Sequence, residues 1–247
     1  MKIIKSRIRY YFFLVIGRFA NLKRSWWISE HTILGETLRW VIKNPGEHIQ
    51  RRQVKHGIYE LKNLTALRNH VEQADLIVDV GANIGNHAVF FLKFLSPRKM
   101  MLFEPYTPAR QHLLHNVSIN LTDPVDVQYY SCGLSDVSGK AGLEPPGQFN
   151  IGLSTLNDTG NDIEVLTGDE VIKDEKVNLI KIDVEGMELN VLRGFEKTLL
   201  RCKPHILIEI SPQNLDACHV YLTKLNFSSV YRHDYKSGMS DHIYSPS

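Results

Sequence analysis

Short apolar runs separated by helical patterns occupy most of the chain after about residue 57. Five runs rich in aliphatic and aromatic side chains are predicted to be buried strands: residues 76–80, 99–103, 125–132, 177–182 and 206–210. Helices are expected at 86–94, 107–120, 185–200 and 215–225, and two antiparallel strands at 228–235 and 241–244. The alternation predicts an α/β fold with a doubly wound, mostly parallel sheet.

The first of these strands leads into a glycine-rich turn. Asp79 is expected where the strand meets solvent, and Gly81 and Gly85 follow it before the helix. A strand, a glycine turn and a helix N-terminus bring backbone N–H groups close to a ligand. Asn83 stands where a dinucleotide fingerprint needs its second glycine, and no Lys follows Gly85 as a phosphate loop requires. The turn therefore fits a ligand without a pyrophosphate, such as S-adenosylmethionine.

A second acidic residue supports a nucleotide-type site. Glu104 ends the next strand, 19 residues after Gly85, where such folds place the carboxylate that accepts the ribose hydroxyls. A solvated strand end is the alternative explanation for an acid at this position. Thr107 is predicted as the N-cap of the following helix, with Pro108 in its first turn.

Several segments resemble the FkbM-type methyltransferases, which use S-adenosylmethionine and mostly methylate hydroxyl oxygens. The segments are DVGANIGN (79–86), FEP (103–105), LSDVSG (134–139), IKIDVEGMELNVLRG (180–194) and, more weakly, ILIEI (206–210). The resemblance runs from about Gly57 to the C-terminus. It implies a Rossmann-like class I methyltransferase fold with a seven-stranded sheet, bound S-adenosylmethionine and methyl transfer to oxygen.

The segment after the third strand has two possible roles. Ser135 and Asp136 fall where residues that contact adenine usually emerge in this fold, although ordinary turn chemistry explains them as well. Residues 142–160 lack periodicity and are rich in Gly, Pro and Asn. We expect a loop or irregular hairpin across the mouth of the site, where substrate specificity often lies.

The candidate catalytic residues follow the fourth and fifth strands. Asp183 and Glu185 follow the fourth strand, and Glu209 lies near the end of the fifth, so their carboxylates are expected to converge. Such a group allows a general base, for which Asp183 is the first choice, or one hard divalent cation. No transition-metal site is predicted. Glu188 is interpreted as a solvated or helix-starting acid.

Histidine and cysteine contribute little to the predicted site. His112 and His115 are three residues apart on a predicted helix and are expected at the surface. The three cysteines are scattered, without a C-x-x-C spacing. This usage favours a reducing compartment, and a cytoplasmic location is therefore expected.

The N-terminal part differs in charge from the rest. Residues 1–56 hold twelve Lys or Arg against three Asp or Glu, whereas residues 57–247 hold seventeen against twenty-four. We predict a basic, aromatic, helical extension over residues 1–56 and a S-adenosylmethionine-binding methyltransferase domain over residues 57–247. With 43% hydrophobic and 23% charged residues, the chain has enough apolar side chains for one sizeable core.

Two uses of the extension are open. The apolar run at 10–16 is far shorter than the roughly 20 residues that span a bilayer, and a cleaved signal peptide is not favoured. Basic residues around paired aromatics fit a segment of residues 1–28 lying on an anionic membrane surface, such as the inner face of the cell membrane, or touching a polyanion. The alternative is an extension that packs its aromatic side chains on the domain.

The predicted function is therefore O-methylation of a hydroxyl on a sugar, glycan, lipid-linked or polyketide-like acceptor. A nucleobase or protein amine methyltransferase is the first alternative, and the basic extension favours it through phosphate attraction. The segment 183–186, DVEG, lacks the Asn- or Asp-Pro-Pro-aromatic motif that amine methylation usually uses, so nucleic acid is not the expected partner. A non-catalytic protein that keeps the nucleotide fold is the second alternative.

Overall fold

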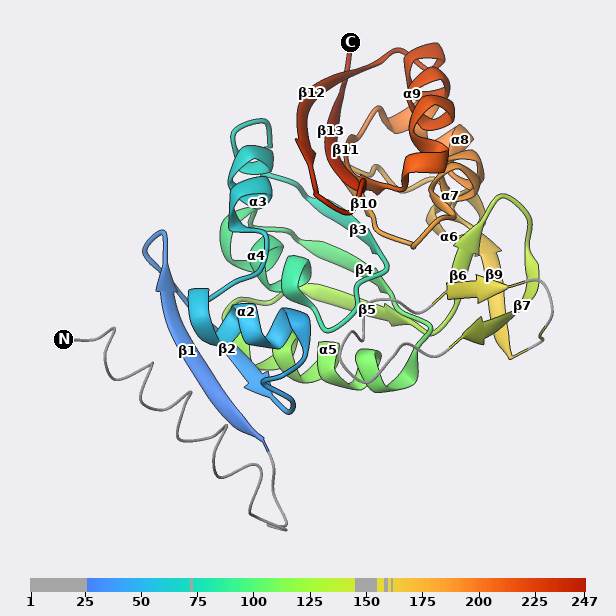
Figure 1. Cartoon of the computed structure of the whole chain (residues 1–247). Helices are drawn as coiled ribbons and strands as arrows, with labels where there is room; N and C mark the ends of the chain where they lie inside the picture. The colour runs from blue at the N-terminus through green and yellow to red at the C-terminus, as the bar shows by residue number, and fades with distance from the viewer. Residues whose placement is uncertain (1–25, 72, 145–154, 158–159, 161) are drawn as a thin grey trace.

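The main feature of the computed structural model is a seven-stranded sheet with helices on both faces (Figure 1). The structure describes residues 26–71, 73–144, 155–157, 160 and 162–247. The strand order is β12-β13-β11-β10-β3-β4-β5. The strands are β3 (Leu76–Val80), β4 (Lys99–Phe103), β5 (Asp126–Tyr130), β10 (Leu179–Ile182), β11 (His205–Ile210), β12 (Phe227–Asp234) and β13 (Ser240–Pro246). The predicted doubly wound, mostly parallel sheet is confirmed.

The central strands are buried on both faces because helices cover both sides. Every residue of β3 and β10 is buried, and the two strands pair in parallel, with Ile77 opposite Leu179 and Val80 opposite Ile182. The chain runs from β3 outward to β4 and β5 and then returns to β10 on the other side of β3. The order in which strands are added to the sheet therefore reverses between β3 and β10, and open α/β sheets bind ligands at such a switch point.

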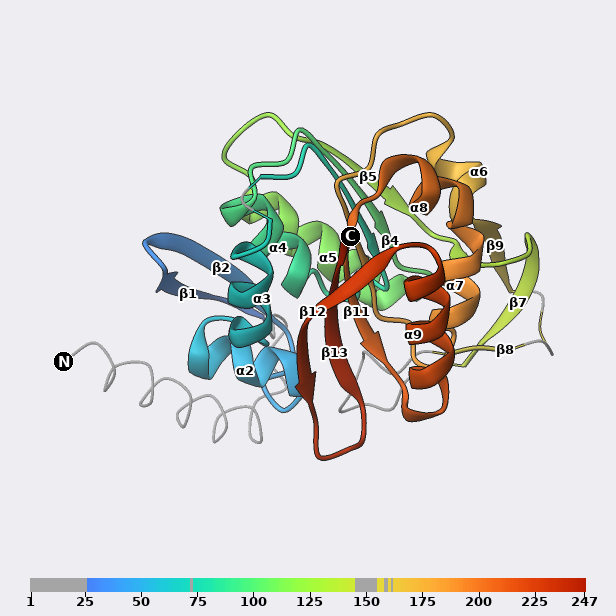
Figure 2. The ribbon, with the colours of Figure 1, turned by 90° about the horizontal axis from the view of Figure 1, so that it is seen from above.

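The helices form two layers, which are visible from two directions in Figures 1 and 2. One layer holds α3 (Leu61–Arg68), α4 (Asn86–Phe94) and α5 (Thr107–Asn120), and the other holds α6 (Gly168–Ile172), α7 (Glu188–Gly194), α8 (Glu196–Cys202) and α9 (Leu215–Lys224). Each layer has its own apolar core against the sheet. The predicted bounds of α4 and α5 are confirmed, except that Tyr106 rather than Thr107 is the N-cap of α5.

One predicted helix is interrupted. Residues 185–200 were expected to form a single helix, but Glu185 and Gly186 have positive φ angles of 47° and 106°. The first helix begins only at Glu188, and a break at Phe195 separates α7 from α8. The prediction was wrong because two left-handed residues in succession turn the chain before the helix can begin.

The extension was predicted to be helical, and this was wrong for its first described part. Residues 27–42 form an antiparallel hairpin, β1 (Trp27–Ile33) and β2 (Glu36–Ile42), followed by α2 (His48–His56). Exposure alternates along β1, as the period-2 pattern of a half-buried strand requires. The side chain of Trp40 is fully buried in the same core as α4 and donates to the Gly57 carbonyl. The division of the chain at residue 56 stays a prediction.

Helix α5 hydrogen-bonds along the outer edge of β2. Asn116 Oδ1 accepts from Val41 N at 2.8 Å, and Asn120 Oδ1 accepts from Arg39 N at 2.9 Å. Asn120 Nδ2 donates back to Arg39 O, and the His112 ring lies against Val41 O. The expectation that His112 is a surface residue was therefore wrong, because its ring is buried against a backbone acceptor. His115 is exposed, as expected.

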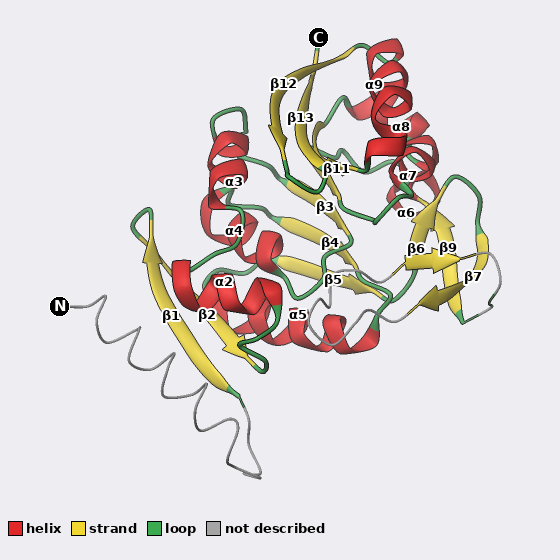
Figure 3. Cartoon of the chain, in the orientation of Figure 1, coloured by secondary structure: helices red, strands yellow, loops and turns green. Residues whose placement is uncertain are grey.

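A small four-stranded sheet stands beside the main one (Figure 3). Its strands are β6 (Gly133–Ser135), β7 (Gly139–Glu144), β8 (Thr155–Asn157) and β9 (Ile163–Thr167), in the order β6-β9-β7-β8. β7 pairs with β8 in antiparallel fashion, as an irregular hairpin would. Most of the predicted specificity loop, residues 145–154 and 158–159, lies outside the described residues. No helix within the described residues has the length and apolarity to cross a membrane.

Candidate active site

A pocket opens at the carboxyl ends of the central strands, where the strand order reverses between β3 and β10. Its volume is about 630 Å³, within the range of small-molecule sites. Three groups of residues line it. The β3, β4 and β6 ends contribute Val80, Gly81, Asn83, Phe103, Glu104, Pro105, Cys132, Gly133 and Leu134; the β10 and β11 ends contribute Asp183, Val184, Glu185, Met187 and Glu209; an outer wall comprises His48, Ile49, Arg52, Tyr59, Glu60, Tyr235, Lys236, Ser237 and Met239.

The two glycines of the turn are required for different steric reasons. Gly81 has φ of 75°, and a Cβ there would overlap the carbonyl oxygen of Asp183, so only glycine lets the two strand ends approach. Gly85 has φ of 89°, but an added Cβ would press on Leu113 of α5. Gly81 therefore lies in the pocket lining, whereas Gly85 serves helix packing and lies outside it.

Asp79 does not meet solvent, so that expectation was wrong. Its side chain is fully buried in the middle of β3, and the Lys181 ammonium of β10 lies 3.2 Å from Asp79 Oδ1. The same ammonium lies 3.5 Å from Asp183 Oδ2 and donates to the Gly81 carbonyl at 2.6 Å. Burial alone would lower the pKa of Lys181, but the carboxylates of Asp79 and Asp183 outweigh it and raise the pKa. The Lys181 ammonium thus links the glycine turn to Asp183.

Glu104 is held in the pocket wall by backbone donors. Its Oε2 accepts from Asn83 N and its Oε1 from Tyr106 N, both at 2.8 Å. The side chain is buried, and this burial raises the pKa of Glu104 to about 7 against the opposing effect of the two N–H groups. Glu104 therefore has a buried carboxylate next to the glycine turn, rather than the solvated strand end that was the alternative.

Unusual backbone conformations gather around the pocket. Glu60, Asn83 and Glu185 all line it and all have positive φ, at 58°, 49° and 47°. Side chains rarely adopt this region, and a residue held there costs of order 1–3 kcal/mol. Asn83 Oδ1 is buried and accepts no hydrogen bond from any described residue. Strain and an unsatisfied acceptor at one place are typical of a ligand site.

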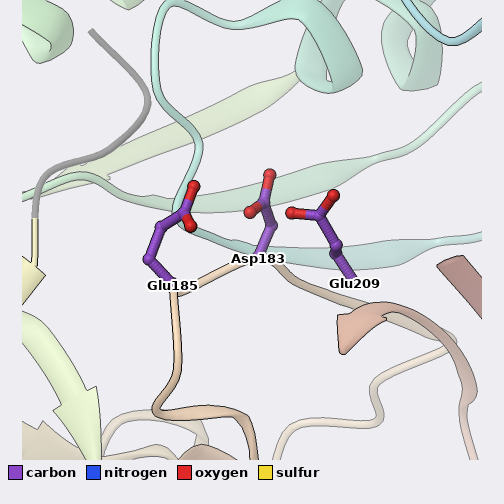
Figure 4. A group of neighbouring side chains, drawn as sticks. All are labelled: Asp183, Glu185 and Glu209. Carbon is purple, nitrogen blue, oxygen red and sulfur yellow. The ribbon is translucent and has the colours of Figure 1, made fainter. Parts of the chain in front are cut away.

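Three carboxylates converge in the pocket, as the sequence predicted. Asp183, Glu185 and Glu209 each offer an oxygen, and these oxygens lie within 4.8 Å of one another. Figure 4 shows the Asp183 side chain between the other two. Burial, with the charge of Asp183, raises the pKa of Glu185 to about 7. Burial and the charges of Asp183 and Asp241 raise the pKa of Glu209 to about 10, so Glu209 carries a proton at neutral pH.

Glu188 belongs to a separate arrangement. Of the two interpretations given for Glu188, the helix-starting acid is confirmed, because Glu188 is the first residue of α7. The solvated acid is wrong, because the side chain is fully buried. Its Oε1 accepts from Gly186 N at 2.8 Å, and its Oε2 accepts from Ser211 Oγ at 3.0 Å and from Asn214. Glu188 therefore closes the turn that presents Glu185 to the pocket.

Ser135 and Asp136 lie beside the pocket and not in its lining. Ser135 Oγ donates to Asp136 Oδ1 at 3.0 Å, and Asn190 Nδ2 donates to the same oxygen at 3.0 Å. The asparagine bond is the main cause of the lowered pKa of Asp136. Contact of Ser135 and Asp136 with adenine stays a prediction.

Sequence reasoning missed the outer wall. Tyr235 in the β12–β13 turn donates to Glu60 Oε1 at 2.8 Å, and His87 Nε2 lies 3.1 Å from Glu60 Oε2. Asn63 donates to the Tyr235 hydroxyl and to Asp241. These residues come from opposite ends of the chain, and no local pattern marks their meeting.

The curated relatives that match the chain are methyltransferases. "Hexuronic acid methyltransferase AglP" of Haloferax volcanii is 31% identical over 137 residues, covering 54% of this chain and 55% of the relative. "Methyltransferase sdnD" of Sordaria araneosa is 25% identical over 170 residues, covering 54% and 65%. The chain thus spans between half and two thirds of the length of these relatives.

Solved structures share the fold, and a family description shows the family. The fold matches a crystal structure of the methyltransferase FkbM from Methylobacillus flagellatus with a TM-score of 0.54 and 18% identity, over 79% of this chain and 52% of that one. An rRNA methylase from Streptococcus thermophilus matches with a TM-score of 0.50 and 13% identity, over 75% and 94%. Residues 79–229 match the family described as "Methyltransferase FkbM domain". The chain belongs to the FkbM methyltransferase domain family.

Proposed function

We propose that this protein transfers a methyl group from S-adenosylmethionine to a hydroxyl oxygen of a sugar, glycan, lipid-linked or polyketide-like acceptor. The observation that carries the proposal is the meeting of the Gly81 turn with the carboxylates of Asp183, Glu185 and Glu209 in one pocket. The name of the Haloferax volcanii relative, a hexuronic acid methyltransferase, favours a sugar acceptor among these classes.

The pocket residues fit the cofactor. A buried carboxylate at Glu104 suits two ribose hydroxyls, and the unsatisfied Asn83 Oδ1 beside it offers a further acceptor. Gly81 leaves space that a side chain would fill. When bound, S-adenosylmethionine supplies a methyl group on a positively charged sulfur. After transfer the sulfur is a neutral thioether, and it is part of the leaving group. A cluster of carboxylates is a favourable surrounding for that positive charge.

Asp183 is the proposed general base. The acceptor hydroxyl must lose its proton as its oxygen takes the methyl group, so the base must lie within hydrogen-bond reach of that oxygen. The Asp183 side chain is about 30% exposed, hence accessible to an acceptor, and the Lys181 ammonium lies 3.5 Å from its Oδ2. Glu209 carries the proton of this group at neutral pH and is suited to hydrogen-bond the acceptor or Asp183.

The same three carboxylates have the composition of a site for one divalent cation. In that case the ion would lower the pKa of the acceptor hydroxyl, instead of a free carboxylate accepting its proton as general base. Dialysis against a chelator separates the two roles. Unchanged turnover after chelation supports Asp183 as the base, and activity that is lost and then restored by magnesium or manganese supports the ion.

The amine alternatives are less favoured by the described residues. After β10 the chain turns through Glu185 and Gly186 in left-handed conformations, with no Pro-Pro-aromatic segment to hold a planar amino group. A non-catalytic binding protein would need neither the buried Lys181 link nor three converging acids. Turnover on hydroxyl acceptors supports the proposal, turnover on amine acceptors alone supports the amine alternatives, and S-adenosylhomocysteine binding without turnover on either class supports a non-catalytic protein.

The experiment has two stages. Calorimetric titration with S-adenosylhomocysteine tests the cofactor site, with dissociation constants expected near micromolar, or roughly −8 kcal/mol. Labelled S-adenosylmethionine is then incubated with candidate glycans and lipids, and the products are identified by mass spectrometry. No binding of either cofactor form, or transfer only to nucleobase or amine groups, would refute the proposal.

The base is tested with matched carboxylate variants. Asp183→Asn keeps shape and hydrogen bonding, so it should leave S-adenosylhomocysteine binding within a few-fold and lower turnover by about 10²–10⁴. Glu164→Gln is the control, because Glu164 is exposed on β9 and outside the pocket lining. Normal turnover of Asp183→Asn together with an inactive Glu209→Gln would show that the base is Glu209.

A further inference from the structure

The basic residues of the pocket lining all lie in its outer wall. The inner half of the pocket, formed by the ends of the central strands, contains four acidic residues and no basic one: Glu104, Asp183, Glu185 and Glu209. The arginine and the lysine of the lining, Arg52 and Lys236, both belong to the outer wall. His48 lies in the same wall, but burial lowers its pKa, so it adds no positive charge near neutral pH.

These two cations have no acidic partner among the described residues. The ion pairs found within residues 26–144 and 160–247 involve neither Arg52 nor Lys236, and both side chains belong to exposed residues. Glu60 lines the same wall, but its carboxylate is engaged by His87 and Tyr235. One guanidinium group and one ammonium group at the pocket mouth are therefore available to a ligand.

Both cations belong to segments that line the same pocket. Arg52 lies on α2, which ends at His56 shortly before Glu60, and Lys236 follows Tyr235 in the β12–β13 turn. The bond from Tyr235 to Glu60 fastens that turn to the segment after α2. The wall is thus a built surface joined across 175 residues of sequence.

The wall also lies outside the part of the chain that defines the family. The family match covers residues 79–229, which include every lining residue of the inner half. Residues 48–60 and 235–239 lie on either side of that span. A methyltransferase keeps its cofactor site and changes its acceptor site, so these flanking segments are where acceptor selection is expected.

We infer that Arg52 and Lys236 select an acceptor that carries an anionic group, a carboxylate or a phosphate, and orient it with its hydroxyl toward Asp183. The inference rests on the proposed function and adds the charge of the substrate. Arg pairs with both anions through two parallel N–H bonds, and Lys adds a point charge. No basic residue lines the inner half, so an anion finds its partners only at the mouth, and the hydroxyl end faces inward.

The test measures binding to the full chain saturated with S-adenosylhomocysteine. Calorimetry compares glucuronic and galacturonic acid, which carry a carboxylate, and glucose 6-phosphate with neutral glucose and galactose. We expect an anionic member to bind about tenfold more tightly than its neutral partner, and this preference to weaken as salt is raised. Which anionic member prevails tells carboxylate from phosphate.

Variants then assign the preference to the wall. The double variant Arg52→Gln/Lys236→Gln should lose the preference while binding S-adenosylhomocysteine within about twofold, and Lys224→Gln, exposed on α9 and outside the pocket, should keep both. Equal binding of anionic and neutral sugars, or a preference that survives the double variant, would overturn the inference. A double variant that loses cofactor affinity would instead assign the cations to the cofactor carboxylate. Failure of the unaltered protein to bind S-adenosylhomocysteine would count against the proposed function.

Discussion

Replacing Glu104 by Gln should change how stability depends on pH. The folded state holds the Glu104 proton up to a pKa of about 7, whereas the ordinary value is 4.5. Because the folded pKa is the higher one, the unfolded state releases the proton first as pH rises. The ligand-free protein should therefore lose stability between about pH 4.5 and pH 7, and the loss is complete above pH 7.

The magnitude follows from the two pKa values. Integrating the linkage relation from pH 5 to pH 8 with values of 7 and 4.5 gives about 2.5 kcal/mol lost by the unaltered protein through Glu104. Gln has no proton to release, so this loss should be absent in Glu104→Gln. The amide also turns one N–H donor group toward either Asn83 N or Tyr106 N, which costs about 1–3 kcal/mol at every pH.

The assay is urea unfolding of both proteins at pH 5 and pH 8. We expect Glu104→Gln to be the less stable protein at pH 5, and the difference to shrink or change sign at pH 8. Glu36→Gln, at the exposed start of β2, controls for loss of one charge. Parallel stability curves for Glu104→Gln and the unaltered protein would refute the reasoning, since burial would then not raise the Glu104 pKa.

Three further predictions concern other parts of the molecule. Gly81→Val should abolish measurable S-adenosylhomocysteine binding in calorimetry, because a side chain would overlap Asp183 O and the φ of 75° is unfavourable for it; near-normal affinity would contradict this. Lys181→Met should lower the unfolding free energy by about 3–5 kcal/mol, and adding Asp79→Asn should recover part of it; an additive double variant would show that the pair is not coupled. Deletion of residues 1–28 should abolish co-sedimentation with anionic liposomes, which should also fall steeply with salt, and equal pelleting would favour a packing role.

Local patterns predicted the elements that build the cofactor side. The strand and helix bounds at 76–80, 86–94 and 99–103 are those of β3, α4 and β4, because each is a short segment of one period between turn residues. Asp183, Glu185 and Glu209 were expected together for a topological reason, since parallel strands end at one edge. Residue type and strand order were sufficient for this half of the pocket.

The remaining features depend on contacts between distant segments. Lys181 occupies a position inside a strand where an apolar residue would be expected, and its role appears only when β10 lies beside β3. The outer wall depends on Tyr235 reaching Glu60. The hairpin at 27–42 differs from the predicted helix because charge and aromatic content do not distinguish the two structures, whereas the alternating exposure of β1 has the period of a strand.

Helix α5 protects the protein from unwanted strand pairing. An exposed edge strand offers free N–H and C=O groups to another chain, and natural proteins block such edges. On β2 the backbone groups of Arg39 and Val41 are already paired with Asn116, Asn120 and His112, so a second molecule finds no free backbone group at these positions. Replacing these helix side chains with leucine would satisfy helical periodicity, yet it would leave that edge open to intermolecular aggregation.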